Sequence, residues 1–225
     1  RRYHGLLAAQ TPGGRYMLLS TLEDTVSVNG RDVPLSSRVH PGVIWPEGFR
    51  ALKETRCSHD GVTFSFVLDS DGTGPDGEIV LHRSVILDRE SCRLVMRWML
   101  DDTPAARAVE GMELVIRPLV NGRNINHLYP ADTARSASVR PLELSTAPCT
   151  GFSFQPEEEI PALIMQMSAS GLRRASFSAE PDWYFKVQYP VEAERGYDFE
   201  EDLLMPGEFR ATLSPGRPVW LSAGT

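Results

Sequence analysis

Four short stretches of this sequence combine aromatic rings with hydrogen-bonding side chains, and each stands beside a strand-like run. They cover residues 3–5, 41–49, 121–129 and 182–184. A flat aromatic ring can stack on the C–H face of a sugar, while Arg, Asn, His and Asp side chains can bond its hydroxyls. Packing of a loop onto the fold would explain Trp45 or Trp183 singly just as well. The coincidence of four such stretches favours a carbohydrate-binding surface.

Other chemistries have weaker signals. Gly13 and Gly14 lack the spacing of a phosphate-binding loop, and no Gly-x-Ser-x-Gly nucleophile motif occurs. The five histidines stand singly, without a pair at ligand spacing, and His82 reads as a half-exposed strand residue. The acidic run at 157–159 is typical of a solvated loop. We therefore expect no metal and no cofactor.

The net charge and the cysteines limit the kinds of partner and the cellular compartment that we expect. The net charge of −7 argues against nucleic acid and against an anionic membrane surface, and no apolar run approaches the roughly 18 residues that span a bilayer. Three distant cysteines, Cys57, Cys92 and Cys149, do not form a disulfide framework. We expect them to be reduced and mostly buried, in a cytoplasmic protein.

The dominant hydrophobic period is two, which is typical of half-buried strands. Alternating runs occupy residues 63–68, 79–87, 93–100, 112–120, 162–167, 183–189 and 219–221. Asn29-Gly30 is a strong hairpin signal, and residues 69–77 read as a surface loop. The pattern predicts an all-β fold, a large antiparallel β-sandwich with one or two short helices, forming a single domain over residues 1–225.

Three local expectations follow. Residues 198–204 form the best helix candidate, with Asp198 as N-cap and Pro206-Gly207 as the stop. Residues 192–206 should make a short helical or turn excursion between strands, with Gly196 at positive φ. The loop at 41–49 should be ordered without regular structure, because its two prolines restrict the chain.

Several longer blocks of the sequence carry a family likeness. They are RRYHGLL (1–7), GRYMLLS (14–20), LED (22–24), HPGVIWPEGF (40–49), IRPL (116–119), RNINH (123–127), WY (183–184), EAERGYD (192–198) and EDLLMPG (201–207). Together they resemble the N-terminal domain of bacterial and archaeal-type glycogen debranching enzymes, the amylo-α-1,6-glucosidase family. One departure lies at 123–127, where the family pattern would place an acid and a ring between Arg and His.

The resemblance implies a sandwich of the supersandwich type that leads an (α/α)6 catalytic barrel, absent from these residues. Glycoside hydrolysis needs two positioned carboxylic groups, and the family carries them on the barrel. We therefore expect this polypeptide alone to be inactive and its parent protein to be a glycoside hydrolase that cleaves α-1,6-linked glucose. A 4-α-glucanotransferase activity of the parent stays open. The implied partners are the protein's own barrel and an α-glucan such as glycogen or limit dextrin.

The substrate-binding candidates are the polar and aromatic members of the four stretches: Arg2, Tyr3, His4, Trp45, Arg123, His127 and Trp183. Changing Arg2 or His4 to Ala in the full enzyme is expected to raise KM far more than it lowers kcat, as loss of uniform binding would. A free-standing carbohydrate-binding module and a purely structural domain are the alternative interpretations.

Overall fold

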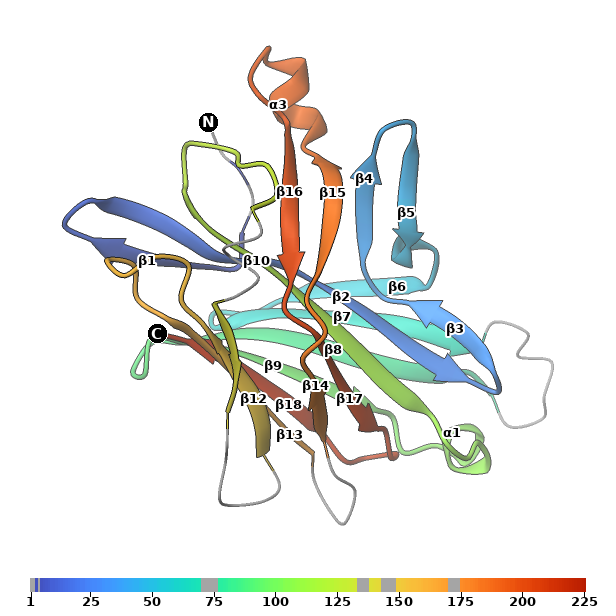
Figure 1. The fold of residues 1–225 in the computed structure, drawn as a ribbon. Coiled ribbons are helices and arrows are strands. Elements are labelled where there is room, and N and C mark those ends of the chain that lie inside the picture. Colours follow the sequence, from blue (N-terminus) through green and yellow to red (C-terminus); the bar gives the residue numbers. More distant parts are fainter. Residues whose placement is uncertain (1–2, 4, 70–76, 133–137, 143–148, 170–174) are drawn as a thin grey trace.

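A computed structural model describes residues 3, 5–69, 77–132, 138–142, 149–169 and 175–225. Two antiparallel sheets lie face to face, which confirms the predicted all-β sandwich (Figure 1). The described residues include two short α-helices, α1 (Pro104–Ala108) and α3 (Pro190–Glu194), and one 3-10 turn, η1 (Gly48–Arg50).

The first sheet contains ten strands. Its main path runs β1 (Leu7–Thr11), β2 (Gly14–Val28), β10 (Glu113–Asn124), β16 (Glu200–Met205), β15 (Asp182–Gln188), β4 (Ser37–His40) and β5 (Val43–Glu47). Beside this path, β3 (Arg31–Pro34) pairs with β2, while β17 (Glu208–Thr212) pairs with β10 and β14 (Ser176–Ser178).

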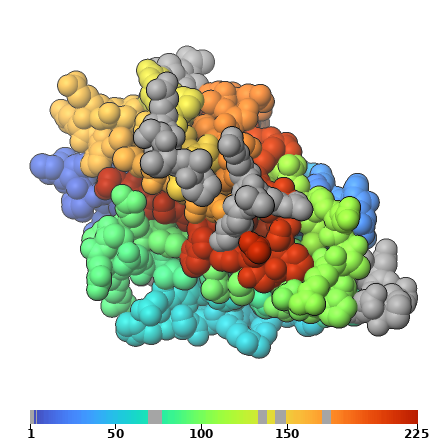
Figure 2. Space-filling view, turned by 90° about the horizontal axis from the view of Figure 1, so that it is seen from below, coloured from blue at the N-terminus to red at the C-terminus, as the bar shows by residue number. Residues whose placement is uncertain are grey.

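The second sheet contains eight strands. Their order is β11 (Val139–Pro141), β12 (Cys149–Phe154), β13 (Leu163–Ala169), β18 (Val219–Gly224), β9 (Arg93–Leu100), β8 (Ile79–Asp88), β7 (Gly61–Asp69) and β6 (Leu52–Cys57). In the view from below, the red C-terminal segment lies between the green segment and the golden one, as this order requires (Figure 2).

Each alternating run of the sequence forms a strand, because one face of each sheet is buried against the other sheet. In β9 the burial alternates strictly, and Trp98 and Met96 are fully buried between the sheets. Asn29 and Gly30 have φ of 51° and 78°, so they form the predicted hairpin between β2 and β3. Of the predicted loop at 69–77, residues 70–76 lie outside the described part of the chain.

The first sheet divides at Pro206-Gly207. Gly207 has φ of 148°, and a Cβ atom at this position would lie 2.1 Å from the Ser178 carbonyl oxygen, so only glycine fits. Below the break, β17 pairs with β10 inside the sandwich; above it, β16 leads a group that rises away from the second sheet (Figure 1). We call this group, made of β4, β5, β15, β16 and α3, the extension, and the rest of the two sheets the body.

The helix predicted at 198–204 is wrong. Residues Glu200–Met205 form strand β16, in which Glu201 and Leu203 share the buried side, because pairing with β15 overrides a weak helical propensity. The helix begins earlier, at Pro190, whose fixed φ suits a first helical turn. An excursion between strands does occur, with Gly196 at φ of 73°, but it spans residues 189–199 and not the predicted 192–206.

Two further expectations need correction. Residues 41–49 do contain regular structure, since β4 and β5 form an antiparallel hairpin there. The three cysteines are free as expected, but all of them are exposed and none is buried. They stand at strand ends and turns, where the edge of a sheet leaves small side chains facing water.

Candidate functional site

Two of the predicted binding residues, Tyr3 and Arg123, meet at the start of the extension. Arg123, the last residue but one of β10, is fully buried, and its Nε lies 2.7 Å from Glu201 Oε2 in a buried ion pair. The Tyr3 ring lies against the Arg123 guanidinium at 5.3 Å and against the Tyr189 ring at 5.6 Å, and its hydroxyl donates to the Asp198 carbonyl oxygen at 2.8 Å. We call Tyr3, Asn121, Arg123, Tyr189 and Glu201 the Arg123 cluster.

The electrostatics of this cluster follow from its burial. Asn121 Nδ2 donates to Glu201 Oε2 at 3.2 Å, and the Tyr189 hydroxyl donates to Glu201 Oε1. Burial raises the pKa of Glu201, while the Arg123 charge works against this rise. Burial, followed by the charge of Glu201, raises the pKa of Tyr189 well above its usual value. The hydroxyl therefore stays a hydrogen-bond donor.

The cluster ties the N-terminal segment, β10, β15 and β16 together, and Tyr3 is only 7% exposed. Neither Tyr3 nor Arg123 offers a free face on which a sugar could stack. Their predicted part in substrate binding stays a prediction, and it would have to act through the residues that they position.

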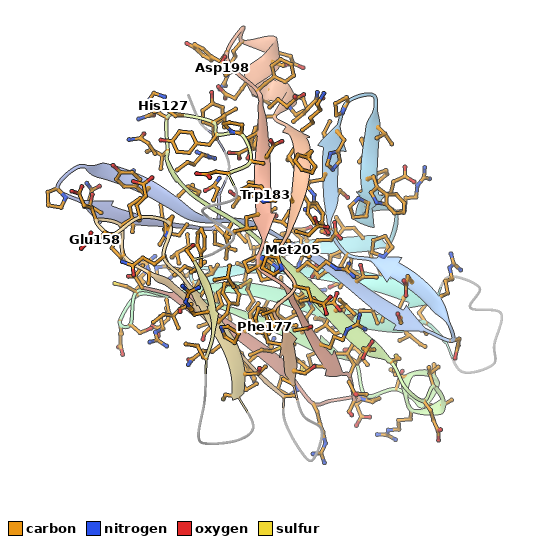
Figure 3. All side chains as sticks on the ribbon, in the orientation of Figure 1. His127, Glu158, Phe177, Trp183, Asp198 and Met205 are labelled. Carbon is orange, nitrogen blue, oxygen red and sulfur yellow. The ribbon has the colours of Figure 1, made fainter. Side chains whose placement is uncertain are left out.

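The other predicted residues are spread over the molecule. Trp45 stands on β5 and is 66% exposed, whereas Trp183 is half-buried and packs against the main core. His127 is exposed on the turn after β10, and it lies well above Trp183 in Figure 3. Arg2 and His4 lie outside the described residues. Of the candidates that the structure describes, Tyr3 and Arg123 are in contact, whereas Trp45, His127 and Trp183 stand on different elements and differ in exposure.

A second buried charge cluster, which the sequence analysis missed, is centred on Glu23 of β2. Arg38 Nη2 donates to Glu23 Oε2, the Tyr184 hydroxyl donates to Oε1 at 2.9 Å, and Arg117 Nη1 donates to Oε1 at 3.3 Å. The Arg38 guanidinium lies 5.1 Å from the centre of the Tyr184 ring. These partners are far apart in sequence, so no local pattern could have indicated the cluster.

A cavity of about 250 Å³ opens beside Arg38, between β2, β4, β15 and α3. Val39, Val187 and Leu203 supply apolar walls. Hydroxyl and amide groups come from five further lining residues: Ser20, Thr21, Ser37, Gln188 and Tyr189. Glu192 of α3 lies opposite in the lining, and Val191, which is exposed, stands at the rim. We call this space the α3 cavity.

The extension also carries most of the exposed large apolar side chains. Among the described residues eleven such side chains are exposed, and eight of them lie in the extension or in the turns next to its strands: Val43, Ile44, Trp45, Phe49, Phe185, Val191, Tyr197 and Phe199. We call these eight residues the extension surface. Soluble proteins rarely leave such groups of apolar side chains in contact with water unless a partner covers them.

A Ser–His–Asp arrangement occurs in the body, on β7, β8 and the end of β9. Ser65 Oγ lies 2.9 Å from His82 Nδ1, and His82 Nε2 lies 3.0 Å from Asp101 Oδ1. A nucleophilic serine must face its substrate, but Ser65 is only 6% exposed. We assign these bonds to the pairing of the strands, with His82 half-exposed as predicted.

The described residues show neither a candidate metal site nor a helix that could span a membrane. They contain no group of three or more His, Cys, Asp or Glu side chains placed to hold a metal ion. In the same part of the chain, no helix has the length and apolar character needed to cross a bilayer. The acidic run at 157–159 is exposed on a turn, as predicted, and Figure 3 shows Glu158 at the edge of the molecule.

Comparison with known proteins agrees with the resemblance seen in the sequence. None of the curated proteins compared matches the chain. The family model described as glycogen debranching enzyme N terminal matches residues 1–220, nearly the whole sequence. The chain therefore belongs to the family of glycogen debranching enzyme N-terminal domains.

Proposed function

We propose that this domain supports the catalytic barrel of a glycogen debranching enzyme and contributes to binding of the α-glucan whose α-1,6 bonds the barrel hydrolyses. The family supplies the setting. The observation that carries the proposal is the extension surface, where eight large apolar side chains of the extension and its adjoining turns are exposed.

The extension surface has the composition of a docking site. Trp45 is 66% exposed and Phe185 is 58% exposed, and large aromatic side chains of this kind dominate the energetics of protein interfaces. Covering these side chains would remove apolar area from water, which stabilises the contact by roughly 25 cal/mol per Å² of area buried. A helical barrel presents the apolar helix faces that would complement this surface.

The glucan-binding part of the proposal rests on different groups. Trp45 presents a flat indole to solvent, and the α3 cavity combines hydroxyl, amide and charged groups with apolar walls. This is the mixture that sugar recognition requires. The three exposed, free cysteines suit a reducing compartment, so we assign the protein to the cytoplasm.

Docking is tested in the full-length enzyme with the double substitution Trp45→Ser and Phe185→Ser. Both side chains are exposed here, so the domain itself should fold normally. We expect calorimetry to show one coupled unfolding transition for the wild type and two separated transitions for the variant, because the contact between domain and barrel is weakened.

The matched control is Leu87→Ser, since Leu87 is also 52% exposed but lies on β8 of the body. The control should keep the single transition. Identical calorimetric traces for the wild type and the double variant would overturn the docking surface. Glucan binding is measured separately, as retardation of the domain in native gels that contain glycogen.

A further inference from the structure

We infer that a cavity between the two sheets, beside Arg83 of β8, is a binding site for a neutral and mainly apolar small molecule that carries one carbonyl group. We call this space the Arg83 cavity. The inference goes beyond the proposed function, because it requires neither the barrel nor a glucan. Its starting point is a guanidinium group that keeps one accessible nitrogen in a mainly apolar space.

The size and lining of the Arg83 cavity are those of a ligand site. It has a volume of about 360 Å³ and is lined by residues of both sheets. Four of the lining residues are buried: Leu22 of β2, Leu35 between β3 and β4, Phe66 of β7 and Met96 of β9. Small-molecule sites in proteins are mostly apolar spaces of about 300–1,000 Å³ with a few polar groups, and this cavity matches that description.

The cavity is accessible from solvent. Leu6, Phe49 and Leu52 also line it, and these side chains are 37%, 48% and 40% exposed. Phe64 and Val85, which are half-buried, supply further apolar walls. A small molecule can therefore enter the space without separating the sheets.

Arg83 supplies a positioned hydrogen-bond donor. Its Nη1 donates to the two carboxylate oxygens of Asp24 at 2.7 and 3.0 Å, and its guanidinium lies 4.9 Å from the centre of the Phe64 ring and 5.1 Å from that of Phe66. Nη2 has no hydrogen-bond partner among the described residues and, unlike Nε, it is not buried. Because Arg83 lines the cavity and the strands enclose its side chain, Nη2 is available to a ligand there.

The other polar side chains of the lining already take part in the fold. Thr21, Ser36 and Ser37 each make a hydrogen bond to the backbone through the hydroxyl group. A single acceptor on the ligand is therefore enough to complete the site, while the rest of the ligand faces apolar walls.

The charges beside the cavity indicate that the ligand is neutral. Asp24 is fully buried and already neutralises Arg83. An anion would bring an uncompensated charge into a mainly apolar space, and a cation would face the guanidinium, so both would be costly. A carbonyl oxygen has no net charge and accepts a hydrogen bond from a cationic donor.

The test is a titration of the 225-residue protein with hexanamide, hexanoate and hexylammonium at neutral pH, followed by NMR of backbone amides. The three probes share one alkyl chain and differ in the charge of the head group. We expect saturable binding of hexanamide, with the largest shifts at Phe64, Arg83 and Val85. Hexanoate and hexylammonium should bind about tenfold more weakly or less, and equal affinities for the three probes would overturn the neutral acceptor.

Two variants locate the site. Leu52→Trp blocks the cavity from an exposed position, and Arg83→Lys keeps a cation for Asp24 but removes Nη2. Each should weaken hexanamide binding about tenfold. Glu158→Trp is the matched control, since it adds the same ring at an exposed turn that does not line the cavity, and it should bind as the wild type does.

The possible outcomes decide this inference separately from the proposed function. Hexanamide shifts that map elsewhere, or binding that persists in both cavity variants, would overturn the Arg83 cavity as the site. Absence of binding by all three probes would also overturn it and would mean that the space holds only water. The calorimetric test of docking and the glycogen gels would be unaffected by any of these results.

Discussion

The body and the extension are stabilised by different interactions. The body has a continuous apolar core between its sheets, which includes Phe66, Trp98, Phe152 and Phe209. The extension has a small apolar cluster of Leu119, Val187, Leu203 and Met205 and relies instead on buried ionic and hydrogen-bonded groups. A group of strands with only one sheet to pack on cannot bury enough apolar area, so polar contacts define its geometry.

Buried charge also occurs in the body. Asp24 is fully buried, and its carboxylate accepts from Arg83 Nη1 at 2.7 and 3.0 Å and from Trp98 Nε1 at 2.9 Å. Unpartnered buried atoms occur in both regions of the described chain: Arg83 Nε and Arg97 Nε in the body, and Arg38 Nε, Arg38 Nη1 and Glu192 Oε2 in the extension. The two regions therefore differ in the size of their apolar cores rather than in how completely their buried charges are paired.

The substitution with the largest expected effect is Arg123→Met, which tests the role of buried ionic groups at the start of the extension. The substitution leaves Glu201 buried without its cation, so the free energy of unfolding should fall by about 3–5 kcal/mol. Urea denaturation measures the loss. The double variant Arg123→Met with Glu201→Leu should recover most of it; equal losses in both variants would show that the ion pair itself is not what matters.

The body should respond to a change in apolar volume instead. Leu81→Ala removes a fully buried side chain from β8 and should lower the free energy of unfolding by about 3 kcal/mol. The same urea experiment measures it, with Leu87→Ala near the exposed end of β8 as control. A loss in the control as large as in Leu81→Ala would contradict the assignment of the core.

The pH dependence of stability distinguishes the two regions further. Burial raises the pKa of Glu201, so the folded protein keeps this proton to a higher pH than the unfolded chain does. Its contribution to stability is therefore greatest below the ordinary glutamate pKa and is lost as the pH rises through the raised value. Relative to Glu201→Gln, the wild type should gain stability as the pH falls through this window; the opposite trend in urea denaturation would show that the Arg123 charge dominates.

The smallest effect is expected at a helix end in the body. Thr103 Oγ1 accepts from the Ala106 backbone N–H at 3.2 Å and caps α1. Thr103→Ala should lower the free energy of unfolding by about 1 kcal/mol, whereas Thr103→Ser keeps the cap and should be nearly neutral. Thermal unfolding compares the two variants, and equal melting temperatures would argue against the cap.

Sequence patterns predicted the body better than the extension. Strands such as β8 and β9 have strict alternation and partners nearby in the chain, so their period alone reveals them. Strand β16 was mistaken for a helix because its identity depends on pairing with β15 and β10 rather than on its own residues. The helical propensity of residues 198–204 gives no information about this pairing.

The candidate site was less predictable for the same reason. Tyr3 and Arg123 were selected as polar groups for a sugar, but the long-range contacts with Tyr189 and Glu201 place them in the interior. Arg38 and Glu192 had no distinguishing local signal, since the contacts that bury them come from residues distant in the sequence or from the tertiary fold. Trp45 is exposed on the β4–β5 hairpin, and its part in substrate binding stays a prediction.

Strand β10 runs through both regions and gives the domain a mechanical character. It pairs with β2 from Glu113 to Val120 and again at Arg123 and Asn124, with register shifts after Leu119 and after Val120, with β17 at its first residues and with β16 at Val120. A force on the extension directed along β10 would act on the hydrogen bonds between β10 and β2 in shear, so that they bear the force together. It would not break them one after another, as unzipping does. Force applied to the extension should therefore be carried into the body through the continuous pairing of Glu113 to Leu119 with β2.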